Sequence, residues 1–312
     1  MNDMSKFQRS WLLFKSSINV IFRNKQLLVF PIVIFALTLV ITLFFVAPVV
    51  LRPTGYGYGE AEHWKAVMEP FFVESHVQSD GSKAFEFAAK PAAIVYGAVL
   101  YIESLFLPTF FNVAFTNEVI AALSGNPVLI GRGLRFACTK LKTIFLWTLF
   151  AGVVGLLIKA MEEKLDFVGR FVVRLIGIAW SVASVFAVPV IVRDETAGNP
   201  LAVLRKSAQS LRKTWGETLI GYVGLTFGNL LVGLASFFLL GGALFLSIAA
   251  DNYWVIAVVG ILWVAALFLF AYITSVASQV YRGALYLYAA EGIVPDPYSK
   301  QLLDMAWKFK KA

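Results

Sequence analysis

The residues of this sequence that could do chemistry are polar side chains placed inside long apolar runs. Glu103 is the clearest case, because it lies about 18 Å along the apolar run 91–123, near the middle of a bilayer core of about 30 Å. An ionisable group at that depth is costly, so it should face other helices, where it could relay a proton or a substrate. The alternative is a structural hydrogen bond to Asn229, which lies at a similar depth. The transport-path candidates are Glu103, Asn112 and Asn229.

No recognised catalytic motif accompanies these residues. The sequence has no phosphate-binding glycine loop, no G-x-S-x-G and no H-E-x-x-H. Its one cysteine, Cys138, has no histidine near it in sequence, and the spacing of His63 and His76 fits no recognised zinc-ligand pattern. We therefore expect no enzyme activity, no cofactor and no metal, and we expect both histidines to lie in a solvated loop.

A basic segment occurs twice in the chain. Residues 125–142 read GNPVLIGRGLRFACTKLK and residues 198–215 read GNPLAVLRKSAQSLRKTW, so that Arg132 matches Arg205 and Lys140 matches Lys213. Cations beside a membrane surface attract anionic phospholipid. The residues predicted to contact lipid or a partner protein are Arg132, Arg135, Lys140, Lys142, Arg205, Lys206, Arg212, Lys213 and Trp215.

Both basic segments also have apolar residues at steps of three and four, which predicts amphipathic helices. The first stripe is Ile130, Leu134, Ala137 and Leu141; the second is Leu201, Leu204, Ala208, Leu211 and Trp215; a diverged third, at the N-terminus, is Phe7, Trp11, Phe14, Ile18 and Ile21. Three roles are open for such helices. They can pack against the ends of neighbouring helices, lie in the lipid interface, or dock a partner.

The composition places these segments in a membrane protein. Of 312 residues, 59% are hydrophobic and only 15% are charged, whereas soluble domains carry about 25% charged residues. We predict one all-α, polytopic membrane domain with six transmembrane helices in three hairpins, each preceded by a cytoplasmic amphipathic interfacial helix. The spans are 27–51, 91–123, 143–160, 171–192, 218–250 and 253–290; the interfacial helices are 1–26, 124–142 and 198–216; an outer loop covers 52–90 and a tail 291–312.

The distribution of charge sets the predicted orientation. Most of the 27 lysines and arginines fall on the N-terminus, the two basic segments and the C-terminal tail, whereas acidic residues gather in the outer loop. Positive loops stay in the cytoplasm, so we expect both termini there. The net charge of +8 is then explained by membrane topology, and nucleic acid is not an expected partner. The expected partners are anionic phospholipid and, beside it, a second copy of the chain or another protein.

Several stretches resemble a known family. They are FFNVAFTNEVIAALSGNP, GIAWSVASVFAVPVIV, LRKSAQSLRKTWGETLIG and VYRGALYLYAAEG. Together they resemble an uncharacterised family of six-span prokaryotic integral membrane proteins, described as a domain of unknown function. That resemblance implies a bacterial or archaeal inner membrane, and it assigns no activity. A weaker likeness is to the membrane domain of glycerophosphodiester phosphodiesterases, whose catalytic barrel is absent from this sequence.

Two functions follow from these patterns. The first is a non-enzymatic scaffold or envelope-organising protein of the inner membrane, which contacts anionic lipid or a partner through its basic amphipathic helices. The alternative is a small transporter or channel with a polar path through Glu103 and Asn229. A transporter needs a continuous polar path between both faces of the membrane, whereas a scaffold needs none.

Overall fold

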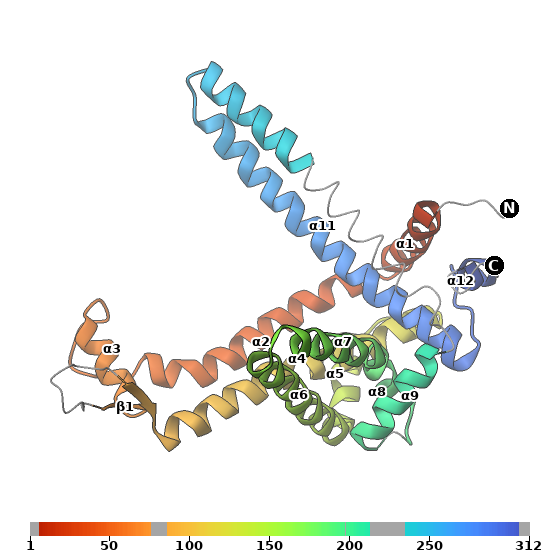
Figure 1. Ribbon diagram of the computed structural model, residues 1–312. Helices are drawn as coiled ribbons and strands as arrows, with labels where there is room; N and C mark the ends of the chain where they lie inside the picture. The colour runs from red at the N-terminus through yellow and green to blue at the C-terminus, as the bar shows by residue number, and fades with distance from the viewer. Residues whose placement is uncertain (1–5, 76–85, 197, 213–234, 306–312) are drawn as a thin grey trace.

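The computed structural model describes residues 6–75, 86–196, 198–212 and 235–305, and these are almost entirely helical (Figure 1). The predicted all-α class is therefore confirmed. Five helical segments are long and apolar enough to cross a membrane. They are α2 (Gln26–Val50), α4 (Pro91–Leu123), α6 (Leu141–Lys164), Phe167–Arg193 and Trp254–Glu291. Of the predicted span 218–250, the structure describes the shorter apolar helix Ala235–Ala249, and residues 218–234 lie outside the described part.

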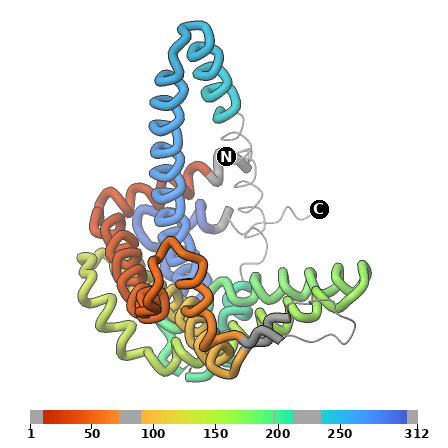
Figure 2. The backbone as a smooth tube through the Cα atoms, turned by 90° about the vertical axis from the view of Figure 1, so that its left-hand side faces the viewer, coloured from red at the N-terminus to blue at the C-terminus, as the bar shows by residue number. Residues whose placement is uncertain are grey.

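The apolar helices form three diverging arms that share one base (Figures 1 and 2). α2 contacts α4 in the first arm, and α6 contacts α7 (Phe167–Ala183) in the second. In the third arm, Ala235–Ala249 runs beside α11 (Trp254–Tyr286), and Trp263 Nε1 donates to Ser236 Oγ over 3.0 Å. We call the base the region that gathers α1 (Lys6–Arg23), α5 (Ile130–Thr139), α8 (Ala187–Arg193), α9 (Pro200–Arg212), the π-helical turn η1 (Leu287–Glu291) and α12 (Lys300–Met305).

The hydrophobic core lies in the base, where Phe30, Phe186 and Val280 are fully buried. Along the arms, apolar side chains are exposed instead; Phe44 and Phe268 each expose 74% of their surface. Exposing apolar surface to water costs about 25 cal/mol per Å², whereas exposing it to lipid does not. The length of the apolar helices and the exposure of their side chains together indicate a membrane protein.

The predicted span 171–192 is not one continuous helix. α7 ends at Ala183 and α8 begins at Ala187, so the helix breaks shortly before its end in the base. A break leaves backbone groups without helical partners, and these are costly when buried. Ser207 of α9 provides partners for two of these backbone groups, because its Oγ accepts from Phe186 N over 3.0 Å and donates to Ala183 O over 2.6 Å.

The buried face of α9 differs from the predicted stripe. Val203, Ser207 and Leu211 are the buried residues of this helix, whereas Leu201 is 66% exposed. Apolar spacing alone does not reveal that Ser207 is drawn inward by the helix break. α1 behaves alike, since Ser17 is buried and Trp11 is exposed.

The outer loop contains a small folded unit. α3 (Ala61–Met68) is followed by strand β1 (Phe72–Ser75), which pairs antiparallel with β2 (Glu86–Ala89). His63 is only 1% exposed, because the rings of Tyr58 and Trp64 cover it, and its Nδ1 lies 2.6 Å from Thr54 Oγ1. The expectation of a solvated histidine was therefore wrong for His63. His76 lies outside the described residues.

Candidate functional site

The first basic segment is locked to α4 by a buried carboxylate. Glu118 has an exposed fraction of 0%, and both its oxygens are occupied. Oε1 accepts from Arg132 Nε over 2.9 Å, and Oε2 accepts from Arg132 Nη2 over 2.6 Å and from Leu129 N over 2.7 Å. The hydrogen bond that Arg132 donates to Glu118 raises the pKa of the Arg132 guanidinium above its usual range. Glu118 is therefore a fully buried carboxylate that is paired with a partly exposed arginine.

Gly133 allows α5 to pack closely against α4 beside this ion pair. A Cβ atom at Gly133 would lie 2.7 Å from Ala114 O and 2.9 Å from Glu118 Cγ, closer than real Cβ contacts. Only glycine therefore permits α5 to lie against α4 at this distance. The close approach brings Arg132 onto Glu118 and leaves Gly133 and Ala137 as the buried face of α5.

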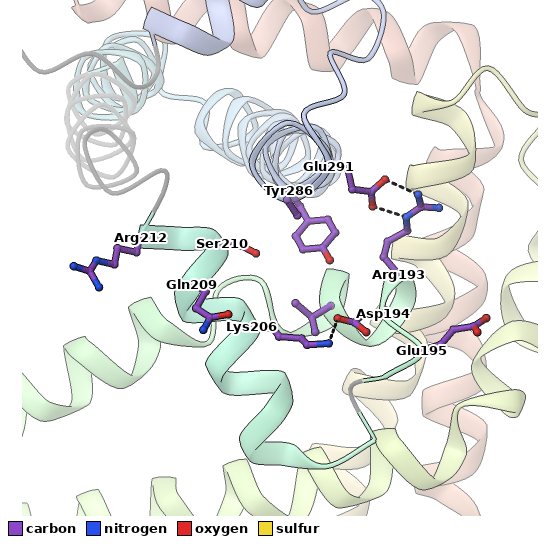
Figure 3. Close-up of a pocket in the computed structure, with 11 residues that line it drawn as sticks. Arg193, Asp194, Glu195, Lys206, Gln209, Ser210, Arg212, Tyr286 and Glu291 are labelled. Carbon is purple, nitrogen blue, oxygen red and sulfur yellow. Dashed lines mark hydrogen bonds and ion pairs between the residues drawn. The ribbon is translucent and has the colours of Figure 1, made fainter.

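One ion pair holds the second basic segment, and a second ion pair lies beside it (Figure 3). Lys206 Nζ donates to Asp194 Oδ2, and it also donates to Thr196 Oγ1 over 2.5 Å. Beside it, Arg193 donates to both oxygens of Glu291, over 2.7 Å and 2.5 Å. Burial alone would raise the pKa of Asp194, but the hydrogen bonds from Lys206 and Thr196 outweigh burial and hold it below its ordinary value. These pairs connect α8 to α9 and to η1.

A cavity of about 900 Å³ lies beside these pairs, where α8, α9, the end of α11 and η1 meet. Its apolar lining includes Val190 and Ala290. Its polar lining includes the hydroxyls of Tyr286 and Ser210, and Figure 3 shows both directed toward the space between their helices. The volume lies within the range of small-molecule sites, which is about 300–1,000 Å³.

The comparison with protein families matches residues 92–295 to a family of unknown function, DUF6159. The chain belongs to DUF6159. The matched region contains α5, α9, both Gly-Asn-Pro segments and all of the residues that line the cavity. No curated protein and no solved structure matches this DUF6159 chain. The family match agrees with the predicted resemblance to an uncharacterised family, and the weaker likeness to glycerophosphodiester phosphodiesterases stays a prediction.

The predicted contact residues of the DUF6159 chain fall into three groups. Arg132 and Lys206 are engaged in the ion pairs above, and Lys140 lies over the Phe136 ring at 5.8 Å from its centroid. The second group is exposed and has no ion-pair partner among the described residues; it consists of Arg135, Lys142, Arg205 and Arg212. Lys213 and Trp215 lie outside the part of the chain that the structure describes.

The transport-path candidates are not brought together. Glu103 is half-buried, and its Oε1 accepts from Thr42 of α2 over 2.9 Å. Asn112 lies about 14 Å farther along α4, where its Oδ1 accepts from Thr116 and from Gln279 of α11, each over 3.4 Å. Asn229 lies outside the described residues, so the hypothesis of a Glu103–Asn229 hydrogen bond stays a prediction.

Sequence reasoning missed the residues that build the cavity, namely Asp194, Ser210, Tyr286 and Glu291. A signal for the ion pairs is present in the sequence, because an acidic residue stands at the base end of three apolar runs, as Glu118, Asp194 and Glu291. Within the described ranges, no group of three or more histidine, cysteine, aspartate or glutamate side chains is placed to hold a metal ion.

Proposed function

We propose that this DUF6159 chain is a non-enzymatic protein of the prokaryotic inner membrane, with six spans in three hairpins and with its base and both termini in the cytoplasm. The five apolar segments and the antiparallel course of each arm support the hairpins. The placement of the exposed cations Arg135, Lys142, Arg205 and Arg212 in the base supports the orientation. α1, α5 and α9 then lie at the inner surface of the membrane, packed on the helix ends.

The single cysteine provides the test of this topology. Cys138 is exposed on α5, so a membrane-impermeant maleimide should label it in permeabilised cells and not in intact spheroplasts. The variant Gly59→Cys/Cys138→Ser should already be labelled in intact spheroplasts, because residue 59 lies in the outer loop and a Cβ there meets no atom within 4 Å. Labelling of Cys138 from outside would refute the orientation.

The proposed role of the base is to contact anionic phospholipid, which makes the protein a scaffold that organises lipid or a partner at the inner leaflet. The observation that carries this proposal is that Arg135, Lys142 and Arg205 are exposed and have no ion-pair partner among the described residues. They lie near Leu141 and Leu201, which are also exposed. Each cation near an anionic surface contributes about 1 kcal/mol, and salt weakens it.

The experiment compares the lipids that copurify with two triple variants. Arg135→Gln/Lys142→Gln/Arg205→Gln should retain several-fold less phosphatidylglycerol relative to phosphatidylcholine when the protein is purified from mixed vesicles. The matched control, Arg52→Gln/Lys164→Gln/Arg170→Gln, removes three exposed cations from the opposite end of the molecule and should retain the wild-type ratio. Equal ratios for the two variants would refute lipid contact through α5 and α9.

The transporter alternative is supported by one feature, the half-buried carboxylate of Glu103 within α4. Its hydrogen bond from Thr42 fits a structural link between α2 and α4 equally well. Replacing Glu103 with Gln keeps a hydrogen-bond acceptor and removes the charge. A transporter that uses this carboxylate would lose proton-coupled uptake in proteoliposomes, whereas a structural link would leave uptake unchanged.

A further inference from the structure

Two of the carboxylates that line the cavity, Asp194 and Glu291, already use both of their oxygens. Asp194 Oδ1 accepts from Thr196 N over 2.9 Å and from Thr196 Oγ1 over 2.7 Å, while Oδ2 accepts from Lys206. Both oxygens of Glu291 accept from Arg193. The remaining carboxylate, Glu195, lies at the edge of the cavity in Figure 3, away from Tyr286. The acceptors near the centre of the cavity are therefore already used.

Several donors of the cavity, in contrast, have no partner among the described residues. No hydrogen-bond partner is found among the described residues for the Tyr286 hydroxyl, the Ser210 hydroxyl, the Gln209 amide or the Arg212 guanidinium. Lys206 Nζ uses two of its three donors, on Asp194 and Thr196. The two hydroxyls can donate to an acceptor, and the remaining N–H of the Lys206 ammonium favours an acceptor that is an anion.

A phosphate group fits this requirement, because its oxygens are acceptors and its charge suits a lysine. We propose that the cavity binds the phosphate of one anionic glycerophospholipid, with Lys206 facing its charge and with Tyr286 and Ser210 donating hydrogen bonds. The proposal rests on the proposed function, because it takes the base to lie at an anionic leaflet. Val190 and Ala290 give the cavity apolar walls, which suit the glycerol part of the headgroup.

A free phosphate ester shares this chemistry, so the experiment must separate it from a lipid. The delipidated full-length protein in a neutral detergent is titrated with dioleoyl phosphatidylglycerol and observed by native mass spectrometry, with and without excess sn-glycerol 3-phosphate. We expect one tightly held lipid per chain that glycerol phosphate does not displace. Displacement by glycerol phosphate at comparable concentrations would overturn the lipid assignment and identify the ligand as a soluble phosphate ester.

Removing two hydroxyls tests the residues themselves. Tyr286→Phe/Ser210→Ala keeps both backbones and the Tyr286 ring contact with Phe186, and it should weaken the tightly held lipid about tenfold. The matched control, Tyr253→Phe/Ser104→Ala, removes the same groups from exposed positions in the arms and should bind like wild type. Equal affinity for the two double variants would overturn the proposal.

The proposed function fails separately from this inference. The triple variant of Arg135, Lys142 and Arg205 leaves every residue of the cavity in place. If that triple variant keeps its lipid ratio while Tyr286→Phe/Ser210→Ala loses the single lipid, lipid contact through the surface is refuted and the cavity stands. If the triple variant loses its lipid ratio while Tyr286→Phe/Ser210→Ala keeps the single lipid, binding in the cavity is refuted and lipid contact through the surface stands.

Discussion

The two Gly-Asn-Pro segments have related sequences but pack in different ways. In the first, α5 closes onto α4, and Glu118 is buried under Arg132. In the second, α9 is held to α8 through Lys206 and Asp194, and a cavity of about 900 Å³ lies beside that pair. Aligned from their first glycine, the two segments place Gly133 opposite Lys206.

That one position explains much of the difference. Glycine has no Cβ, so α5 can approach Ala114 O closely, and no space remains between the helices. Lysine at the same position needs room for its side chain, and its ammonium reaches Asp194 and Thr196 instead. A repeated segment can therefore serve as a rigid clamp in one copy and as the wall of a binding site in the other.

The largest expected effect comes from removing the buried carboxylate that holds the first Gly-Asn-Pro segment to α4. Glu118→Ala removes a fully buried carboxylate and leaves Leu129 N and Arg132 Nε without their acceptor, which should cost about 3 kcal/mol of unfolding free energy. Asp194→Ala, in the partly exposed pair, should cost less than about 1 kcal/mol. Chemical denaturation in mixed micelles measures both. Equal losses would contradict the distinction between the two copies.

The second prediction concerns the close approach itself. Gly133→Ala places a methyl group against Ala114 O and should cost about 2 kcal/mol, because backbone must move. Gly131→Ala, on the same helix, meets no atom within 4 Å and should be neutral or slightly stabilising. The apparent melting temperatures of the two variants give the comparison. A stable Gly133→Ala protein would show that the glycine does not set the packing distance.

A third, smaller effect is expected at the break between α7 and α8. Ser207→Ala leaves Phe186 N and Ala183 O without their side-chain partner, which should cost about 1–2 kcal/mol. Ser207→Thr keeps the hydroxyl and should recover part of the loss. The control Ser104→Ala removes an exposed hydroxyl and should be neutral. If Ser207→Ala melts like wild type, the serine does not hold the break.

The smallest expected effect is a pH dependence of the stability that Asp194 contributes beside the second Gly-Asn-Pro segment. The pKa of Asp194 in the folded protein lies below its ordinary value of 3.8, so its ion pair stabilises the fold above that value and loses its effect as the pH falls through the lower, folded pKa. The stability advantage of wild type over Asp194→Asn should therefore be constant near neutral pH and shrink below about pH 4. An advantage that persists unchanged to pH 3 would contradict this assignment.

Physical patterns in the sequence were sufficient for the class of the protein. Long apolar runs can satisfy their backbone groups in lipid only as helices, so the all-α class and the presence of several helices long enough to cross a membrane followed directly. Apolar spacing was less reliable for the faces of the basic helices. It predicted an apolar stripe on each helix but not which residues are buried: Leu201 and Trp11 are exposed, whereas serines on those helices are buried and hydrogen-bonded.

The sequence by itself determined which segments are apolar and where the cations lie. Only the tertiary structure decided that Arg193 meets Glu291 across the base, that Ser207 joins the ends of a broken helix, and that Tyr286 and Ser210 face one cavity. Each of these contacts joins segments far apart in the chain. Local patterns carry no information about such contacts, since they depend on how whole helices pack.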